Sequence, residues 1–294
     1  MFVHAPADRP SKAPLVVVLH GCTQSAEDYA SPAGWLDLAD RFGFVVLAPE
    51  QTRANNPNLC FNWYLPGEGQ AGPREARSIA AMIAQAVETF DLDAGRVFVT
   101  GLSAGGAMTA TLLATYPDLF AGGAVMAGLA HGSARSMAAA FSAKAGQTDA
   151  DARELGSRVR GSSGRTGPWP TVSVWHGQSD TIVRPAAGEA LARQWCDVHG
   201  IVDAPKTARI PAGRDFLVWM DPQGRPAVEL HRIVGMGHGT PVKANGPDSC
   251  GGASTYTPET GASSSLRSRS AGGSPRRTVV LRPTRRLPTV RPVG

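Results

Sequence analysis

The chain has 294 residues, of which 42% are hydrophobic and 18% are charged, so wholesale disorder is excluded. No apolar run reaches the ~18 residues that a membrane-spanning helix needs. The formal net charge of +5 is unevenly distributed, because eight arginines and no acidic residue fall within 261–294. The first 260 residues carry a slight excess of acidic groups, which argues against a nucleic-acid partner for this part of the chain.

This contrast predicts a folded domain over 1–260 and a basic tail over 261–294. The tail is rich in Ser, Pro and Arg, a composition typical of a solvated, disordered segment. The first twenty residues lack a basic start, a long apolar stretch and a small-residue cleavage site, so no signal peptide is visible. A cytoplasmic location therefore stays open.

Apolar β-branched runs alternate with helical patterns along most of the chain. In chain order we predict a strand over Leu15–Leu19, a helix over Gly34–Phe42, a strand over Phe44–Ala48, a long loop over Asn55–Gly72, a helix from Pro73 to Phe90, a strand over Arg96–Thr100, a helix over Ala104–Tyr116, a strand over Gly123–Ala127, weak helices and a loop over Ser133–Pro168, a strand over Val172–Trp175, a helix over Pro185–Val198, and a hairpin of Phe216–Met220 with Ala227–Val234. Such alternation predicts an α/β fold, with a mostly parallel, doubly wound sheet and helices on both faces.

The most informative motif is the G-x-S-x-G pattern Gly101-Leu102-Ser103-Ala104-Gly105. It lies between a predicted strand and a predicted helix, where the glycines leave room for a sharp reversal of the chain. Ser103 should therefore stand clear of the sheet at the N-terminus of a helix. This context indicates a nucleophile rather than an ordinary turn serine.

A serine hydroxyl is a poor nucleophile near neutral pH, so it needs a base, and the base needs an orienting acid. In this arrangement the acid and then the histidine follow the serine along the chain. His238 lies in a glycine-rich loop after a strand, whereas His199 and His231 fall near a helix end and inside a strand. Asp180 follows the fifth predicted strand, where a capping or turn role is the alternative. We predict a triad of Ser103, Asp180 and His238.

An oxyanion formed at Ser103 needs two backbone N–H donors. Ala104, directly after the nucleophile, should supply one. The loop His20–Gln24 follows the first predicted strand, and we assign the second donor to the N–H of Cys22. This is a role for the backbone of Cys22, and its thiol need not react.

Five segments carry a family resemblance. The runs LVVVLHGCTQSAEDYA, CFNWY, RVFVTGLSAGGAMTA, WHGQSDTIVRP and GMGHGTPV, in this order, resemble the poly(3-hydroxybutyrate) depolymerase family of serine esterases, to which feruloyl and acetylxylan esterases are related. The resemblance covers Leu15 to about Leu266. It implies an α/β-hydrolase fold, the same triad and the same oxyanion donors. It also implies esters of hydroxyacids, or feruloyl and acetyl esters on polysaccharide, as substrates, and an extracellular or periplasmic location.

The reaction implied is ester hydrolysis through an acyl-enzyme, which needs no metal and no organic cofactor. Alternatives are a peptidase or lipase on the same fold, or a damaged or non-catalytic binding protein. Trp63 and Tyr64, in the long loop, are candidates for substrate binding, because aromatic rings supply apolar area at little entropic cost. An anchoring role in the core is an equal alternative for Trp63.

The four cysteines show no C-x-x-C motif and no zinc-like spacing, so the sequence predicts no metal site. If the chain is exported, two disulfides with three possible pairings can form. We expect Cys22–Cys60, since both cysteines follow strand ends, and Cys196–Cys250. Four free thiols in a reducing compartment are the alternative.

The sequence departs from the family pattern at both ends. Met1 lies only 14 residues before Leu15, so we expect the extra leading strand of the relatives to be missing. Ser263–Leu266 resembles the opening of the family's last helix, but the basic tail begins at Arg267. A reading-frame change near Leu266 would explain this, and resequencing the coding region checks it.

Overall fold

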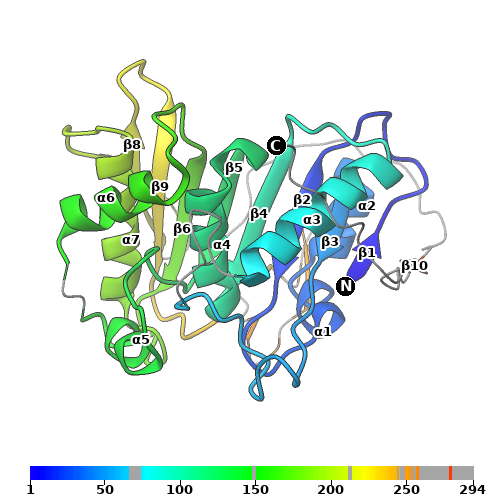
Figure 1. Cartoon of the computed structure of the whole chain (residues 1–294), viewed down its shortest axis with the longest axis horizontal. Helices are drawn as coiled ribbons and strands as arrows, with labels where there is room; N and C mark the ends of the chain where they lie inside the picture. The colour runs from blue at the N-terminus through cyan, green and yellow to red at the C-terminus, as the bar shows by residue number, and fades with distance from the viewer. Residues whose placement is uncertain are drawn as a thin grey trace, which may run out of the picture.

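In this computed structural model the described residues are 1–65, 74–147, 150–210, 214–243, 245, 249–252, 254, 256–257 and 278–279. The strands are β1 (Phe2–His4), β2 (Leu15–Leu19), β3 (Val45–Ala48), β4 (Val97–Leu102), β5 (Gly122–Met126), β6 (Thr171–Gly177), β7 (Lys206–Ile210), β8 (Arg214–Met220), β9 (Pro226–Ile233) and β10 (Thr278–Val279). These described strands form one ten-stranded sheet in the order β10-β1-β3-β2-β4-β5-β6-β9-β8-β7 (Figure 1). Its centre, from β3 to β9, is parallel, and its two margins are antiparallel.

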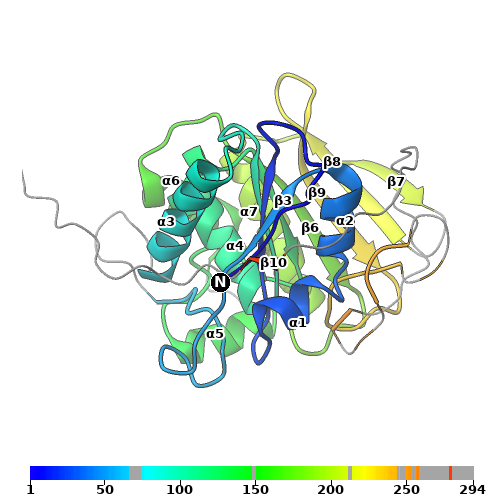
Figure 2. The ribbon, with the colours of Figure 1, turned by 90° about the vertical axis from the view of Figure 1, so that its right-hand side faces the viewer.

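Helices cover both faces of the sheet (Figure 2). They are α1 (Ala26–Ala30), α2 (Trp35–Phe42), α3 (Arg74–Thr89), α4 (Ala104–Thr115), α5 (Met137–Lys144), α6 (Ala152–Ser163) and α7 (Pro185–Val198). The helices α1 and α2 lie on one face, and α3, α4, α6 and α7 on the other. The short α5 lies at the lower edge of the sheet in Figure 1, where the parallel strands end. No helix of the described residues has the length and apolar character that crossing a membrane requires.

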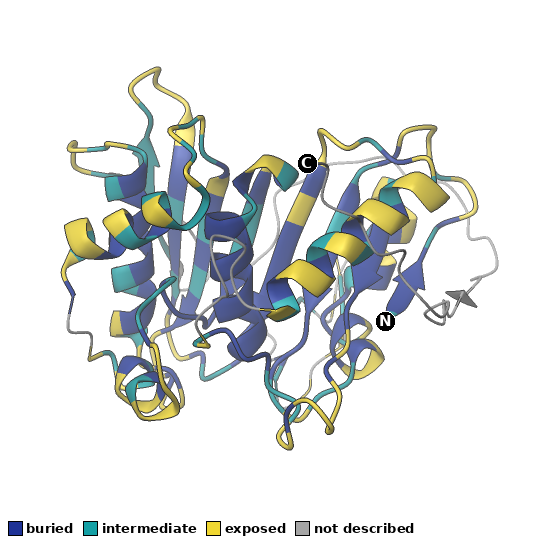
Figure 3. Ribbon diagram, viewed as in Figure 1, coloured by how far each residue is buried: buried dark blue, intermediate teal, exposed yellow. Residues whose placement is uncertain are grey.

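The main core lies between the sheet and α4. Every residue of α4 is buried, and Figure 3 shows this helix and the central strands buried beneath more exposed neighbours. The helix approaches β2 so closely that a Cβ on Gly105 would lie 2.3 Å from the carbonyl oxygen of Leu19. Only glycine fits there, and the close approach brings the N-terminus of α4 against the end of β2.

The mixed α/β architecture predicted from the sequence is confirmed, and the helix predicted over Pro185–Val198 has those bounds in the structure. The short elements α1 and β7 are among those that the sequence analysis missed. The five-residue helix α1 is too short for a periodic pattern, and β7 is an edge strand whose run KTARI contains two charged residues.

The expectation that a leading strand is missing was wrong. Phe2–His4 forms β1, which pairs antiparallel with β3 through Phe2 and Ala48. Three residues suffice for this strand, and a loop returns the chain to β2. The distance from Met1 to Leu15 did not indicate so short a strand, because the 14 residues before Leu15 leave room for three paired residues and a loop.

Most of the predicted tail over 261–294, including the proposed start of a last helix at Ser263–Leu266, lies outside the described residues. Thr278 and Val279 are described, and they form β10, which pairs antiparallel with β1. The division into a domain over 1–260 and a tail stays a prediction.

Candidate active site

Ser103 is the single residue that turns the chain from β4 into α4. Its backbone has φ 57° and ψ −116°, a strained conformation for a residue with a side chain. The N–H of Ser103 donates to the carbonyl of Met126 on the neighbouring strand at 2.9 Å, which fixes the turn. A Cβ on Gly101 would lie 2.5 Å from the backbone of Gly105, so the tightness of the turn requires glycine. The turn places Ser103 at the edge of the sheet where the parallel strands end.

Asp180 and His238, 58 residues apart, meet at the same edge. His238 Nδ1 donates a hydrogen bond to Asp180 Oδ2 at 2.8 Å. Asp180 follows β6 and His238 follows β9, and these two strands are parallel neighbours. Their loops are held together by the N–H of Ser179, which donates to the carbonyl of Met236 at 3.0 Å. The pairing leaves Nε2 of His238 free of Asp180 and able to accept a proton.

Ser103 lies at this edge too, since β4 runs parallel to β6 within the same sheet. Among the described residues, no hydrogen bond joins the hydroxyl of Ser103 to His238. Contacts of this type commonly tighten only when substrate binds. The structure thus brings Asp180 and His238 into contact and places Ser103 on their side of the sheet.

Asp180 is buried, with 1% of the residue exposed. Burial alone would raise the pKa of its carboxyl, but hydrogen bonds from His176, His238 and the Val183 N–H hold the pKa well below its ordinary value. The N–H groups of Ile182 and Val183 both donate to Asp180 Oδ1 at 2.9 Å. An ionised Asp180 favours the form of His238 that carries its proton on Nδ1.

The turn after β2 contains three consecutive backbone N–H groups, those of Gly21, Cys22 and Thr23, and two of them have acceptors. The N–H of Gly21 donates to Gln24 Oε1 and that of Thr23 donates to the carbonyl of Asn58, both at 2.8 Å. Within the described residues, the N–H of Cys22 has no acceptor. Ala104, the first residue of α4, has no partner for its N–H within the helix. The two predicted oxyanion donors are therefore available, and both residues line one pocket with Ser103.

The predicted Cys22–Cys60 disulfide is present, and it joins the turn after β2 to the long loop after β3. The predicted Cys196–Cys250 disulfide was wrong, because both thiols are free. Cys196 is buried in α7 within the core on one face of the sheet, whereas Cys250 packs against Gly34, beside α2 on the other face. The sheet separates them. Burial raises the pKa of the Cys196 thiol to about 12, so this thiol is unreactive.

Sequence reasoning missed a polar network that shapes the long loop. Glu75, on α3, accepts hydrogen bonds from the side chains of Gln51, Asn55 and Asn62 and from the N–H of Asn62, at 2.6–2.8 Å. Gln51 also donates to the carbonyl of Cys60 at 3.0 Å. A single carboxylate thus holds the part of the loop from Gln51 to Asn62, and no spacing of residue types in the sequence signals it.

His20 links this loop to the turn after β2. Its Nδ1 donates to the carbonyl of Gly21 at 2.7 Å, and its Nε2 accepts the N–H of Gln51 at 3.1 Å. Burial lowers the pKa of His20. A neutral imidazole is the form that can donate through one nitrogen and accept through the other.

Ser103 opens into a pocket of about 130 Å³. Trp63 and Tyr64, the predicted substrate-binding residues, line it and contact each other edge to face, with ring centroids 5.6 Å apart. Trp63 is only 7% exposed and also belongs to the main core, so the anchoring and lining roles weighed from the sequence coincide. The remaining lining residues are Cys22, Asn56, Asn58, Cys60, Ala104, Leu129, Met137, Ala140, Phe141 and Lys144.

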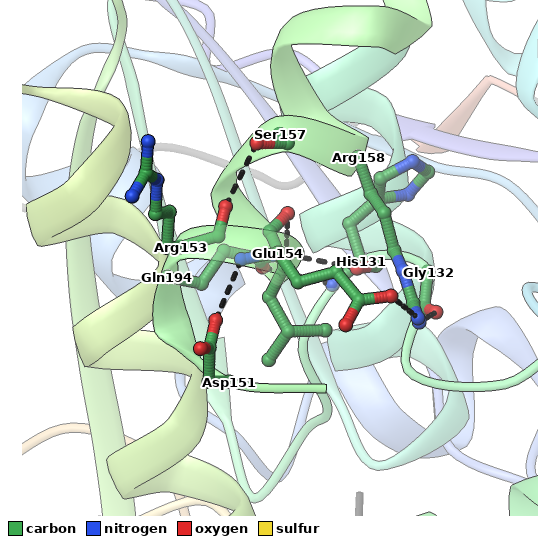
Figure 4. Close-up of polar contacts among 9 residues, drawn as sticks. His131, Gly132, Asp151, Arg153, Glu154, Ser157, Arg158 and Gln194 are labelled. Atoms are coloured by element: carbon green, nitrogen blue, oxygen red, sulfur yellow. Dashed lines mark hydrogen bonds and ion pairs between the residues drawn. The ribbon is translucent and has the colours of Figure 1, made fainter. Parts of the chain in front are cut away.

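The segment between β5 and α5, which leads into one pocket wall, is fixed by partly buried polar contacts (Figure 4). Gln194 accepts the N–H of His131 at 3.0 Å and donates to its carbonyl at 2.8 Å. Arg158 donates to the carbonyl of Gly132. The ring of His131 contacts Ser162 Oγ through Nε2 at 2.8 Å. Helices α6 and α7 thereby hold the start of this segment.

Stability should fall in mild acid because of His131. Burial, with smaller effects of Arg158 and Arg135, lowers its pKa to about 4. As the pH falls below the ordinary value near 6.5, the unfolded chain binds a proton that the folded chain refuses until about pH 4. The free energy of unfolding should therefore drop by roughly 3 kcal/mol from this group between pH 7 and pH 4. Urea unfolding of His131→Gln should show a smaller drop than the parent protein, and an equal drop would contradict the assignment.

Among the described residues, no three His, Cys, Asp or Glu side chains gather closely enough to hold a metal ion.

The chain is similar to several known esterases and depolymerases. The chain is 43% identical to poly(3-hydroxyalkanoate) depolymerase C of Paucimonas lemoignei, over 87% of this chain and 62% of that protein. It is 32% identical to feruloyl esterase B of Thermothelomyces thermophilus, over 72% of this chain and 74% of that enzyme. It is also 32% identical to an acetylxylan esterase of Coprinopsis cinerea, over 82% of this chain and 65% of that enzyme. The chain thus spans less than two thirds of the length of the depolymerase.

Among solved structures, the acetyl xylan esterase from Aspergillus awamori superimposes with a TM-score of 0.69 at 25% identity, covering 80% of this chain and 87% of that one. The fold is that of the α/β hydrolases, as the resemblance implied. The family model described as esterase PHB depolymerase matches residues 2–217, which hold the elements from β1 to β7, the first part of β8 and the Ser103 turn. On these grounds the chain belongs to the esterase PHB depolymerase family.

Proposed function

We propose that this protein is a serine hydrolase of carboxylic esters. The observation that carries the proposal is the strained Ser103 turn, which lies on the side of the sheet where Asp180 and His238 pair. A hydroxyl at a helix N-terminus, a histidine oriented by an ionised carboxylate, and two available N–H groups are the parts that acyl transfer needs.

The reaction proceeds in two halves. His238 Nε2 takes the proton of Ser103 as its Oγ attacks the ester carbonyl, and the N–H groups of Cys22 and Ala104 hold the resulting oxyanion. The carbon–oxygen bond to the alcohol then breaks, and His238 returns the proton to the leaving oxygen. Water, activated by the same histidine, attacks the acyl-enzyme and releases the acid. Asp180 orients the imidazole and stabilises its charged form.

The substrates we propose are hydroxyalkanoate oligomers or polymers, or feruloyl or acetyl esters attached to polysaccharide. The names of the relatives support these classes, and the aromatic pair Trp63–Tyr64 beside Ser103 suits an apolar acyl group.

Parallel assays on poly(3-hydroxybutyrate), methyl ferulate, acetylated xylan, p-nitrophenyl butyrate and a peptide anilide test this proposal. We expect ester cleavage without anilide cleavage, together with covalent labelling of Ser103 by a fluorophosphonate. A folded protein that cleaves none of the esters and takes up no label would overturn the proposal. Anilide cleavage at a comparable rate would favour a peptidase instead.

We also propose that the protein acts outside the cytoplasm, since structural disulfides persist in oxidising compartments. The Cys22–Cys60 bond supports this location.

Thiol titration of denatured, unreduced protein should find two reactive thiols, Cys196 and Cys250. Closing the loop between Cys22 and Cys60, 38 residues apart, stabilises the fold by about 4 kcal/mol in the chain-entropy treatment. Urea unfolding with and without reductant should show a loss of that order. Cys196→Ala, which leaves the disulfide intact, is the control and should keep its sensitivity to reductant. Four titratable thiols would refute the pairing.

A further inference from the structure

The pocket beside Ser103 lies on the acyl side of the proposed reaction. Its lining contains Ser103 and both proposed oxyanion donors, Cys22 and Ala104, but His238 is not part of it. In acyl transfer the histidine protonates the leaving alcohol, so the alcohol departs on the histidine's side. The acyl group must then extend away from His238, into this pocket.

Its walls are mostly apolar, with one charged side chain among the lining residues. Trp63, Tyr64, Met137 and Phe141 supply aromatic and aliphatic surface, and Asn56 and Asn58 supply amides. Lys144, at the end of α5, is the charged residue among the described lining residues, and none of these is acidic. An ester whose acyl group is neutral throughout has no use for this charge.

Lys144 is free to bind a ligand. Its ammonium group lies 5.5 Å from the ring centroid of Phe141, a cation–π contact that holds it beside another lining residue. No Asp or Glu of the described residues lies within ion-pair distance of it. Its carbonyl accepts the N–H of Arg184 at 2.8 Å, which fixes the end of the helix that carries it. The lining thus contains both a nucleophile, Ser103, and a cation that has no acidic partner among the described residues.

We infer that Lys144 selects acyl groups that end in a carboxylate, so that half-esters of short dicarboxylic acids are substrates of this site. The inference rests on the proposed ester hydrolysis. The apolar walls contact the methylene chain, and the ammonium group pairs with the distal carboxylate while Ser103 attacks the ester carbonyl at the other end. An acyl group of equal length that ends in a methyl ester or in an alkyl carbon, instead of a carboxylate, cannot form this ion pair.

The test compares mono-(4-nitrophenyl) glutarate with 4-nitrophenyl valerate, which have acyl chains of five carbons and differ in the terminal carboxylate. After subtraction of spontaneous hydrolysis, Lys144→Gln should raise KM for the glutarate about fivefold, as expected for a partly exposed ion pair, and change KM for the valerate less than twofold. Lys144→Arg should restore the KM for the glutarate. Raising the salt concentration should weaken the glutarate preference of the parent protein and leave Lys144→Gln unaffected.

Lys12→Gln, which removes an exposed lysine before β2, at the opposite edge of the sheet, is the matched control and should leave both KM values unchanged. Equal effects of Lys144→Gln on the two esters, or no effect on either, would overturn the inference and leave the proposed hydrolysis standing. Failure of the parent protein to hydrolyse either ester would instead overturn the proposed function and the inference with it.

Discussion

Ser103→Ala should abolish hydrolysis of p-nitrophenyl butyrate, with kcat reduced by about 10⁴–10⁶. The substitution removes the hydroxyl that forms the acyl-enzyme and leaves the oxyanion donors and the pocket in place. Alanine tolerates the positive φ of this turn no better than serine does, so the strain in the backbone is unchanged. A loss of rate can therefore be attributed to the missing hydroxyl and not to a change in the backbone of the turn.

The circular dichroism spectrum and the urea midpoint of Ser103→Ala should match those of the parent protein. Ser31→Ala, at an exposed serine after α1, is the control and should keep full activity. If Ser103→Ala keeps a substantial fraction of the parent rate, another residue is the nucleophile.

Asp180→Asn should reduce kcat by about 10⁴. The amide keeps the size of the side chain, and its oxygen can still accept the N–H groups of Ile182 and Val183. It removes the negative charge that faces Nδ1 of His238 at 2.8 Å. The imidazole then loses the partner that fixes its tautomer and stabilises its protonated form, so the proton of Ser103 has no effective acceptor.

Asp221→Asn is the matched control for this variant. Asp221 also accepts backbone N–H groups in a turn, those of Gln223 and Arg225, but it lies between β8 and β9, at the edge of the sheet opposite to Ser103. The Asp221→Asn substitution should lower the free energy of unfolding slightly and leave kcat at the parent value. Similar losses of rate in the two variants would mean that Asp180 acts through folding and not through His238.

Signals that are local in the sequence predicted the fold correctly and led to the candidate site residues. The run LVVVL indicates a buried parallel strand whatever surrounds it, and the G-x-S-x-G pattern needs only its neighbouring strand and helix. Asp180 and His238 could be proposed because the carboxyl ends of parallel strands share one edge of the sheet. Residues that directly follow such strands in the sequence therefore lie near one another in the fold. The same rule placed Cys22 and Cys60 close together.

What failed depends on contacts between distant segments. The spacing of cysteines does not say which face of a sheet each one occupies, so Cys196 and Cys250 were paired across a layer that separates them. The hydrogen bonds of Glu75 join α3 to the long loop that precedes it, and those of His20 join the turn after β2 to the loop after β3. Each residue alone resembles an ordinary polar side chain. Lys144 reads from the sequence as a basic residue at a helix end, a common feature with a purely structural explanation.

The two loops beside Ser103 are tied to each other by a disulfide, by the imidazole of His20 and by the hydrogen bond from Thr23 to Asn58. For protein engineering this makes them one exchangeable unit. A chimera that takes residues 20–24 from one relative and residues 51–65 from another would separate the two partners of all three contacts. Grafting both segments from the same parent would keep the partners together and transfer this side of the pocket intact.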